Sequence, residues 1–483
     1  MEWFGRASVE FTHAASPLQL PLKAGAGASP AEGSSNGTAT QATTDLAQIC
    51  RDSTPACQLN PLLFNGHLQT MWTAVAKGAP AIHYKRRIFN ADHALYTGTF
   101  AVDFAVPPYA DEHLERDAAL PPRTSYFADD AAFAGMASDD TRPMLLVLHG
   151  LSGGSYEVYL RHCLAPLLDA DDLPWEIAVV NARGCAGSSI TSGVLFNARA
   201  TWDVRQVALW ARKTFPNRPL FGLGFSLGAN ILTNYVGEEG AACPLQAAVV
   251  VGNPFDLQVS NKILQRSFMG RHVYETVMGS KWWWRMACSS SSGDVASVTV
   301  GDTANGVEPK ADICAGNMKK LINLHRDAIL KHTELDLDRI NKITTLYEFD
   351  REVQCPTWGY PTEEAYYRDA SSCDSLLNIR IPFLALQAKD DPIAVEEAIP
   401  YGEFRHNPYT VLCTTSLGGH LSWFEPGGGR WHAKPVTQFL HTMAKNVDLA
   451  AIPRDLLDVN AKQRKGVNFE PLRRRMQINL DKE

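Results

Sequence analysis

The segment Leu220-Phe-Gly-Leu-Gly-Phe-Ser-Leu-Gly-Ala-Asn230 decides the fold. Its first six residues form a short apolar run typical of a buried strand, and residues 227–236 follow a helical pattern that Gly237 is placed to end. The turn between them fits the pattern G-x-S-x-G around Ser226. Such a pattern occurs by chance in a chain with 35 glycines, but between a strand and a helix it predicts a sharp turn that raises the serine hydroxyl above a sheet.

Similar apolar runs recur along the chain and give way to turn residues. They are Met144–Leu148, Trp175–Val180, Ala247–Val251, Pro382–Leu386 and Thr410–Cys413. The stretch Thr201–Lys213 places small and branched apolar residues on one helical face. Strands that alternate with helices predict an α/β fold with a mostly parallel central sheet and helices on both faces.

Composition shifts divide the chain into segments. Residues 23–44 are rich in Gly, Ala, Ser and Thr, and such a stretch buries too little apolar surface to offset its ordering entropy. The alternation of strands and helices is interrupted after residue 255 and resumes near residue 377. We therefore expect a flexible N-terminal segment (1–56), a core in two parts (57–255 and 377–446), an inserted helical cap (256–376) with a loose loop at 288–308, and a C-terminal tail (447–483).

Length and charge exclude several classes of protein. The 483 residues carry a net charge of −7, which argues against a nucleic-acid partner. No apolar run is long enough for a transmembrane segment, and the first residues lack the pattern of a signal peptide. The ten cysteines form no C-x-x-C pair, so we expect reduced thiols and a cytoplasmic location. The basic tail that includes Arg473–Arg475 is expected to be solvated, with weak peripheral contact with a membrane or lipid droplet as the alternative.

A serine hydroxyl needs a base that an acid orients before it can act as a nucleophile at neutral pH. On this type of sheet the acid and then the histidine follow the serine in chain order. Asp390 and Asp391 follow the strand that starts at Pro382, and His420 follows two glycines after the strand that starts at Thr410. We favour Asp391, which directly precedes a proline, over Asp390 as the acid.

Other histidines are weaker candidates for the base. His406 precedes its strand, and His432 and His441 lie in a terminal helical region where packing or surface roles are expected. His67, in Asn65-Gly-His67, could touch the site, but a structural hydrogen bond is the simpler interpretation.

Acyl-transfer intermediates also need N–H donors for the developing oxyanion. We expect these donors to be the backbone N–H of Leu227, which follows the nucleophile, and that of Leu151 in the glycine-rich turn His149-Gly-Leu-Ser-Gly-Gly-Ser155. A plain turn is the alternative for that segment. A phosphate cradle is disfavoured because G-x-x-x-x-G-K-[ST] is absent from the sequence.

Together with the serine, acid and histidine, several motifs resemble one branch of the α/β-hydrolase superfamily. The motifs are Asn60–Thr70, His149–Gly154, Asn181–Gly187, Gly222–Asn230, Tyr347–Asp350, Tyr366-Tyr367, Asp390–Pro392 and Gly418–His420. This branch contains the fungal medium-chain fatty-acid ethyl ester synthase/esterases and the animal abhydrolase-domain phospholipases. The resemblance covers about residues 57–445 and implies a Ser226, Asp391, His420 triad. Animal members carry an N-terminal membrane anchor that this sequence does not show, and the 288–308 insertion lengthens the cap.

The resemblance implies a serine esterase and acyltransferase that acts on medium-chain acyl esters or thioesters and passes the acyl group to water or an alcohol. Alternatives are a phospholipase or lipase on glycerolipids, an acyltransferase for a specialised metabolite, and a non-catalytic binding protein of the same fold. Trp282–Trp284 could line an acyl channel or simply pack in the cap. The sequence shows neither a metal-ligand cluster nor a dinucleotide fingerprint, so we expect no cofactor.

Overall fold

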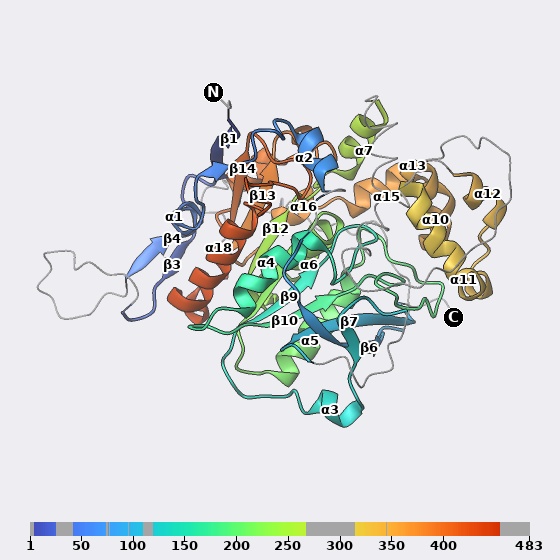
Figure 1. The fold of residues 1–483 in the computed structure, drawn as a ribbon, viewed down its shortest axis with the longest axis horizontal. Helices are drawn as coiled ribbons and strands as arrows, with labels where there is room; N and C mark the ends of the chain where they lie inside the picture. Colours follow the sequence, from blue (N-terminus) through green and yellow to red (C-terminus); the bar gives the residue numbers. More distant parts are fainter. Residues whose placement is uncertain are drawn as a thin grey trace, which may run out of the picture.

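The structure is a computed structural model of the chain, and it describes residues 4–25, 42–73, 76, 78–94, 96–109, 119–266, 314–343 and 345–454. Within this part a ten-stranded sheet runs through the centre (Figure 1). In spatial order its strands are β2 (Val9–His13), β14 (Thr410–Thr415), β13 (Phe383–Ala388), β12 (Leu245–Val251), β11 (Leu220–Phe225), β9 (Met144–Leu148), β10 (Glu176–Val180), β7 (Thr99–Val106), β6 (His83–Asn90) and β8 (Thr124–Tyr126).

The six strands from β14 to β10 run parallel to one another, which confirms the predicted fold class. Nearly all their residues are buried because helices cover both faces of the sheet, and this explains the uninterrupted apolar runs. Outside them, β2 pairs antiparallel with β14, β7 pairs antiparallel with β10, and β6 pairs antiparallel with β7.

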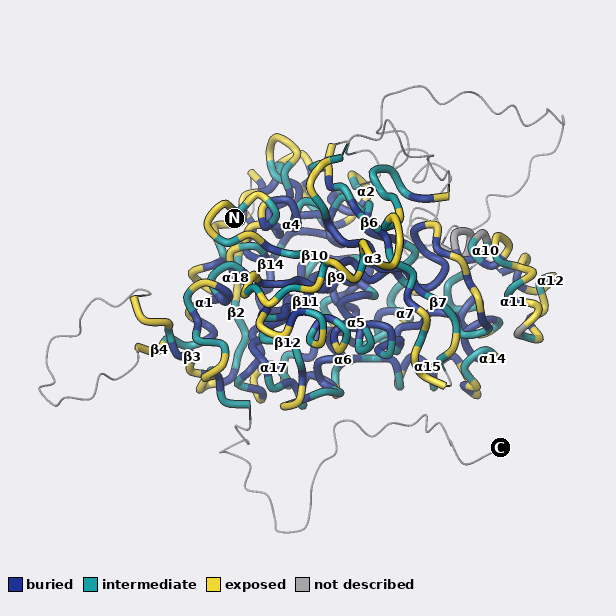
Figure 2. The backbone as a smooth tube through the Cα atoms, turned by 90° about the horizontal axis from the view of Figure 1, so that it is seen from below, coloured by how far each residue is buried: buried dark blue, intermediate teal, exposed yellow. Residues whose placement is uncertain are grey.

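Two helical layers enclose the sheet (Figure 2). One layer contains α1 (Leu46–Asp52), α4 (Val158–Leu168) and α18 (Ala433–Asn446). The other contains α5 (Thr201–Thr214), α6 (Leu227–Glu239), α16 (Cys373–Leu376) and α17 (Tyr401–His406). The remaining core helices are α2 (Gly66–Trp72) and α3 (Asp130–Ala134). No helix in the described ranges is both long and apolar enough to cross a membrane.

One helix end differs from the prediction. Gly237 does not end α6, which continues to Glu239 and ends at Gly240. Gly237 instead allows close packing on α16, because a Cβ there would lie 2.4 Å from the carbonyl oxygen of Ser375.

The expectation of a flexible segment over residues 1–56 is wrong for the residues that the structure describes. The strand β2 extends the main sheet. Two small antiparallel pairs also form, one between β1 (Arg6–Ala7) and β5 (Cys57–Gln58) and the other between β3 (Gln19–Pro21) and β4 (Thr43–Asp45). Leu18, Leu20 and Leu46 are fully buried in the main core. Their burial supplies the apolar contacts that the neighbouring Gly/Ser-rich stretch lacks. Residues 26–41 lie outside the described part.

Two further segment boundaries can be compared with the structure. The first residues of the expected tail pack on the core, since Val447 and Ile452 are buried. Between β12 and β13 the chain forms α7 (Leu257–Arg266), α10 (Cys314–Leu324), α11 (Arg326–His332), α12 (Leu337–Lys342), α13 (Leu346–Phe349), α14 (Cys355–Trp358) and α15 (Glu363–Ala370) before it reaches α16. Three of the predictions concern segments that lie outside the described residues. These segments are the expected loop at 288–308, Trp282–Trp284 and Arg473–Arg475.

A core loop, residues 195–200, is hydrogen-bonded to the cap helices. The N–H of Ala198 donates to the Tyr366 hydroxyl at 3.0 Å, and the Gln354 side chain donates to the carbonyl of Phe196 at 3.2 Å. Tyr367 in turn donates to the buried carboxyl of Asp350 at 2.7 Å. The motifs around Tyr347 and Tyr366 therefore join the cap to the loop that also approaches the serine turn.

Candidate active site

Ser226 lies in the turn between β11 and α6 with a backbone conformation that L-residues rarely adopt, φ 52° and ψ −118°. Its two glycine neighbours make the turn possible. A Cβ on Gly224 would lie 2.7 Å from Cα of Ala229, and one on Gly228 would lie 2.5 Å from the carbonyl oxygen of Leu148. The strain holds the hydroxyl at the carboxyl end of the parallel strands, where α/β active sites are built.

The structure brings the three predicted side chains together. Nε2 of His420 lies 2.9 Å from Oγ of Ser226, and Nδ1 of His420 lies 2.8 Å from Oδ2 of Asp391. The three residues retain only 7%, 8% and 3% of their surface exposed, in the order Ser226, His420, Asp391. The strands β11, β13 and β14 thus deliver one side chain each to a single hydrogen-bonded row.

The two adjacent aspartates have different environments. Asp391 turns towards His420, and its other oxygen accepts the N–H groups of Ile393 and Ala394 at 2.8 and 2.9 Å. Two such donors stabilise a carboxylate and fix its orientation. Asp390 instead accepts the N–H of Gly419 at 3.0 Å, and burial followed by the nearby Asp391 charge raises its pKa to about 6.

A helix that the sequence reasoning had not connected with the reaction holds the histidine loop. The N–H of His420 donates to Oγ1 of Thr70 at 2.9 Å, and Gln69 accepts the N–H of Phe424 at 2.8 Å. At the start of the same helix α2, a Cβ on Gly66 would lie 1.8 Å from the carbonyl oxygen of Asp390. The motif Asn60–Thr70 therefore positions His420, and its adjacent polar residues Gln69 and Thr70 were the signal for this role.

His67, the alternative member of that motif, has its side chain exposed. The side chains of the triad, by contrast, are buried. His432 is fully buried and His441 pairs with Asp172 at 3.2 Å, so these two histidines also have the packing and surface roles that were expected.

The turn after β9 lies beside the serine, since a Cβ on Gly150 would be 3.4 Å from Cβ of Ser226. His149 fixes one peptide unit of this turn. Its Nε2 accepts the N–H of Ala182 at 3.0 Å, so its Nδ1 carries the proton and donates to the carbonyl of Gly150 at 2.6 Å. Burial lowers the pKa of His149 to about 4 and keeps the ring neutral. Because a trans peptide is planar, this bond turns the N–H of Leu151 away from His149.

Further buried contacts anchor the same turn, and the sequence reasoning missed their residues. The N–H of Gly150 donates to the Tyr159 hydroxyl at 2.8 Å, and Ser155 donates to Asp103 at 2.6 Å. Asp103 also accepts both ends of the Arg86 guanidinium at 2.6 and 2.8 Å. A bidentate buried pair is a rigid anchor because removal of either charge leaves the other uncompensated.

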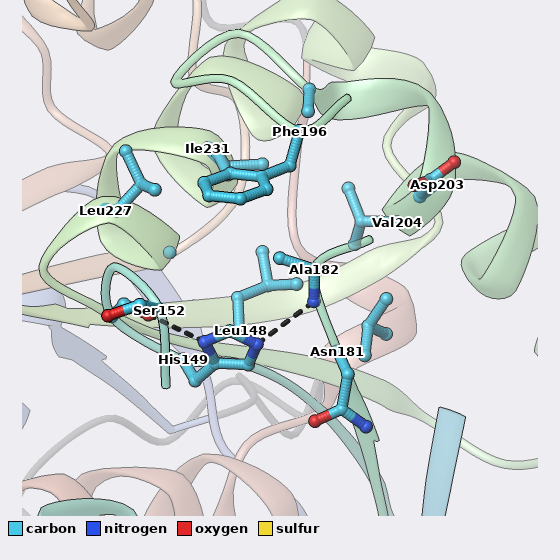
Figure 3. A pocket seen from close by; sticks show the side chains of 14 residues that line it. Leu148, His149, Ser152, Asn181, Ala182, Phe196, Asp203, Val204, Leu227 and Ile231 are labelled. Carbon is cyan, nitrogen blue, oxygen red and sulfur yellow. Dashed lines mark hydrogen bonds between the residues drawn. The ribbon is translucent and has the colours of Figure 1, made fainter. Parts of the chain in front are cut away.

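A small cavity of about 30 Å³ lies between this turn and the first residues of α6 (Figure 3). Figure 3 shows Phe196 and Ile231 on one side of it and His149 on the other. The lining is mostly apolar. Among the described residues no group of His, Cys, Asp and Glu is arranged to hold a metal ion.

Comparisons with known proteins agree with this geometry. A family model described as the alpha/beta hydrolase fold matches residues 143–425. The chain is 35% identical to a monoacylglycerol lipase of Saccharomyces cerevisiae over 85% of both chains. It is 30% identical to the medium-chain fatty acid ethyl ester synthase/esterase 2 of the same yeast over 79% of this chain and 84% of the relative. Human phospholipase ABHD3 is 27% identical over 63% of this chain and 65% of its own.

These matches confirm the branch that the sequence motifs indicated, since esterases and phospholipases of that kind are among the relatives. The family model and the strand order of the sheet agree on the same fold. The chain therefore belongs to the α/β-hydrolase family of enzymes.

Proposed function

We propose that the protein is a serine ester hydrolase and acyltransferase in which Ser226 is the nucleophile, His420 the general base and Asp391 the carboxylate that orients it. The observation that carries the proposal is the continuous row of hydrogen bonds from Oγ of Ser226 through His420 to Asp391. Asp391 accepts from Nδ1–H, which leaves Nε2 free to take the serine proton.

The reaction proceeds in two acyl transfers. Oγ of Ser226 attacks the ester or thioester carbonyl carbon while its proton passes to Nε2 of His420. The tetrahedral intermediate collapses, His420 returns the proton to the leaving alcohol or thiol, and an acyl-serine remains. Water or an alcohol then loses its proton to His420 and attacks the acyl-serine. The bond to Oγ of Ser226 breaks, His420 returns the proton to Oγ, and an acid or a new ester is released.

The oxyanion of each intermediate is proposed to accept the N–H groups of Leu151 and Leu227. Leu227 is the first residue of α6, whose initial N–H groups have no partner within the helix. The hydrogen bond from His149 to Gly150 orients the Leu151 N–H. Preorganised donors of this kind lower the barrier because they meet charge only as it develops.

The relatives support the proposed substrate class. Medium-chain acyl esters or thioesters are the first candidates, with water or an alcohol as acceptor. The 35% identity to a monoacylglycerol lipase favours glycerolipid esters as the second candidate. Both candidate substrates present an acyl carbonyl to Ser226, and they differ from each other in the group that leaves.

The test uses p-nitrophenyl esters of increasing acyl length, with and without ethanol, on the protein and on Ser226→Ala. We expect a burst of nitrophenol that Ser226→Ala abolishes and that Ser188→Ala, which removes another buried serine hydroxyl, retains. Ethyl ester formed in the presence of ethanol supports acyl transfer to alcohols, and release of glycerol from monoacylglycerol supports the lipase candidate. Turnover that persists in Ser226→Ala would contradict the proposal.

A further inference from the structure

The turn that follows His420 is strained. Leu421 and Trp423 have φ values of 54° and 41°, in the left-handed region that L-residues rarely adopt. The Ser422 hydroxyl donates to the carbonyl of His420 at 2.8 Å. The N–H of Trp423 donates to the carbonyl of Gly418, also at 2.8 Å. Strained backbone persists only where surrounding contacts hold it, and it is typical of active sites.

One buried side chain, that of Arg430, bonds to this turn. Its Nη1 donates to the carbonyl of Leu421 at 2.5 Å and, more weakly, to the carbonyl of Ser422 at 3.4 Å. Its guanidinium carbon lies 4.3 Å from the centre of the Phe424 ring, and only 2% of its surface is exposed. The guanidinium thus contacts the two successive peptide groups that join Leu421 to Trp423.

The other buried arginines are bonded differently. Four arginines in the described part of the chain are buried, and they are Arg86, Arg183, Arg218 and Arg430. In each of the first three, Nε and Nη2 donate to the two oxygens of an aspartate. In Arg430 the same two nitrogens are buried without a hydrogen-bond partner among the described residues. This guanidinium therefore lacks the carboxylate that normally compensates a buried charge, and its bonds go to the strained turn instead.

The uncompensated burial of Arg430 opposes the stability of the fold. Burial lowers the pKa of its guanidinium to about 10, although the group stays protonated at neutral pH. An apolar side chain of similar length would fill the same space without leaving a buried charge unpaired. A residue that breaks a rule of stable packing in this way is expected where function requires it.

We propose that Arg430 is a positioning residue for His420, an inference that rests on the proposed function. Its Nη1 fixes the orientation of two peptide groups, and with them the strained dihedral angles on either side. The imidazole must stay 2.9 Å from Oγ of Ser226 and 2.8 Å from Oδ2 of Asp391 to accept the serine proton. Arg430 acts on this geometry through the backbone of the turn.

The test compares Arg430→Met, which keeps the length and removes every donor, with Arg430→Lys, which keeps a charged donor. The control is Arg218→Met. Arg218 is equally buried and also stacks on an aromatic ring, but it precedes β11, whereas Ser226 follows that strand at its other end. On a p-nitrophenyl ester we expect kcat to fall about 10²-fold in Arg430→Met and about tenfold in Arg430→Lys, with KM little changed, because a small misplacement of a catalytic group costs a factor of this order. Arg218→Met should keep the kcat of the unaltered protein.

Urea titration should give the opposite order. The unfolding midpoint of Arg430→Met should equal or exceed that of the unaltered protein, because the substitution removes a buried charge that has no carboxylate partner. The midpoint of Arg218→Met should be lower, because Asp140 loses two hydrogen bonds. Loss of activity without loss of stability separates a positioning role from a merely structural one.

A third readout does not depend on turnover. The proton between Nδ1 of His420 and Oδ2 of Asp391 should give a low-field resonance in the proton NMR spectrum, which is assigned by its absence in His420→Gln. We expect this resonance in the unaltered protein, in Arg430→Lys and in Arg218→Met. It should be broadened or lost in Arg430→Met, because a ring that moves exposes the proton to exchange with water.

Three results would overturn the proposal. The first is an Arg430→Met with unchanged kcat and an unchanged resonance. The second is an Arg430→Met that unfolds at lower urea concentration or does not fold. The third is a loss of kcat that is as large in Arg430→Lys as in Arg430→Met. If the unaltered protein does not hydrolyse the ester, the proposed function fails, while the resonance in Arg430→Met still decides whether Arg430 positions His420.

Discussion

Replacement of His149 by leucine tests how the oxyanion donors are held. The side chain of His149 is buried and joins the N–H of Ala182 to the carbonyl of Gly150 with hydrogen bonds of 3.0 and 2.6 Å. His149→Leu removes both bonds and leaves the carbonyl of Gly150 held only by the weaker bond from the N–H of Gly153 at 3.1 Å, so the peptide between Gly150 and Leu151 is held less firmly. Complete loss of one oxyanion donor costs about 10²–10³ in kcat, so for a loosened donor we expect a decrease of about tenfold to 10²-fold. KM should change little, because the oxyanion forms only after binding.

The same substitution should also change the stability of the fold. The part-buried N–H of Ala182 loses its partner at a cost of up to about 1–3 kcal/mol, so the variant unfolds at lower denaturant concentration. His149→Gln keeps one donor and one acceptor and should recover part of the lost kcat. Steady-state kinetics on a p-nitrophenyl ester, with circular dichroism to establish folding, measure both effects. A folded His149→Leu with the kcat of the unaltered protein would refute the proposed role of the Leu151 N–H.

Three other predictions follow from the site. Thr70→Val should lower kcat for a p-nitrophenyl ester about tenfold, since the N–H of His420 loses its acceptor and the histidine loop loosens; an unchanged kcat would contradict this role of Thr70. Asp391→Asn should lower kcat by about 10⁴, and Asp390→Asn by far less; the reverse order would make Asp390 the acid. Burial raises the pKa of Asp350 to about 7 although Tyr367 donates to it, so the folded state binds this proton more tightly than the unfolded chain. Stability therefore falls as pH rises from about 4 through 7, and Asp350→Asn should be more stable at pH 8 by up to about 4 kcal/mol in urea titrations; a variant that is no more stable would contradict the shift.

The parallel strands could be predicted because a strand that is buried on both faces appears in the sequence as an unbroken run of apolar residues that ends at a turn. The edge strands lack this signature. β2 reads Val-Glu-Phe-Thr-His, which is short, partly polar and close to a Gly/Ser-rich stretch, and only its pairing with β14 reveals it. The flexible N-terminal segment was expected for the same reason, since local composition does not report contacts with residues about 400 positions away.

The site was predictable where chemistry fixes residue type and chain order. Ser226 and His420 follow from the turn motif and the order of the strands. The choice between Asp390 and Asp391 depends on which carboxylate the turn aims at the ring, and this is set by the N–H groups of Ile393 and Ala394. Because Asp390 and Asp391 are adjacent and identical, the sequence alone does not indicate which carboxylate points at the ring of His420.

The supporting residues were beyond local sequence reasoning. Thr70 lies 350 positions before His420 in the chain, and Arg86 is linked to the glycine-rich turn through Asp103, which accepts from Ser155. Each of these bonds depends on the completed sheet. In the sequence these bonds are indicated only by polar residues at positions where the surrounding pattern would predict apolar ones.

The central claim is that acyl transfer passes through an acyl-serine at Ser226. The most direct measurement is peptide mass spectrometry after rapid acid quench of the protein mixed with a p-nitrophenyl ester. The account predicts that the mass of the acyl group appears on the peptide that contains Ser226, grows with the nitrophenol burst, and is absent in Ser226→Ala. Ester turnover without any acylated peptide, or acylation at the same level in Ser226→Ala, would contradict it.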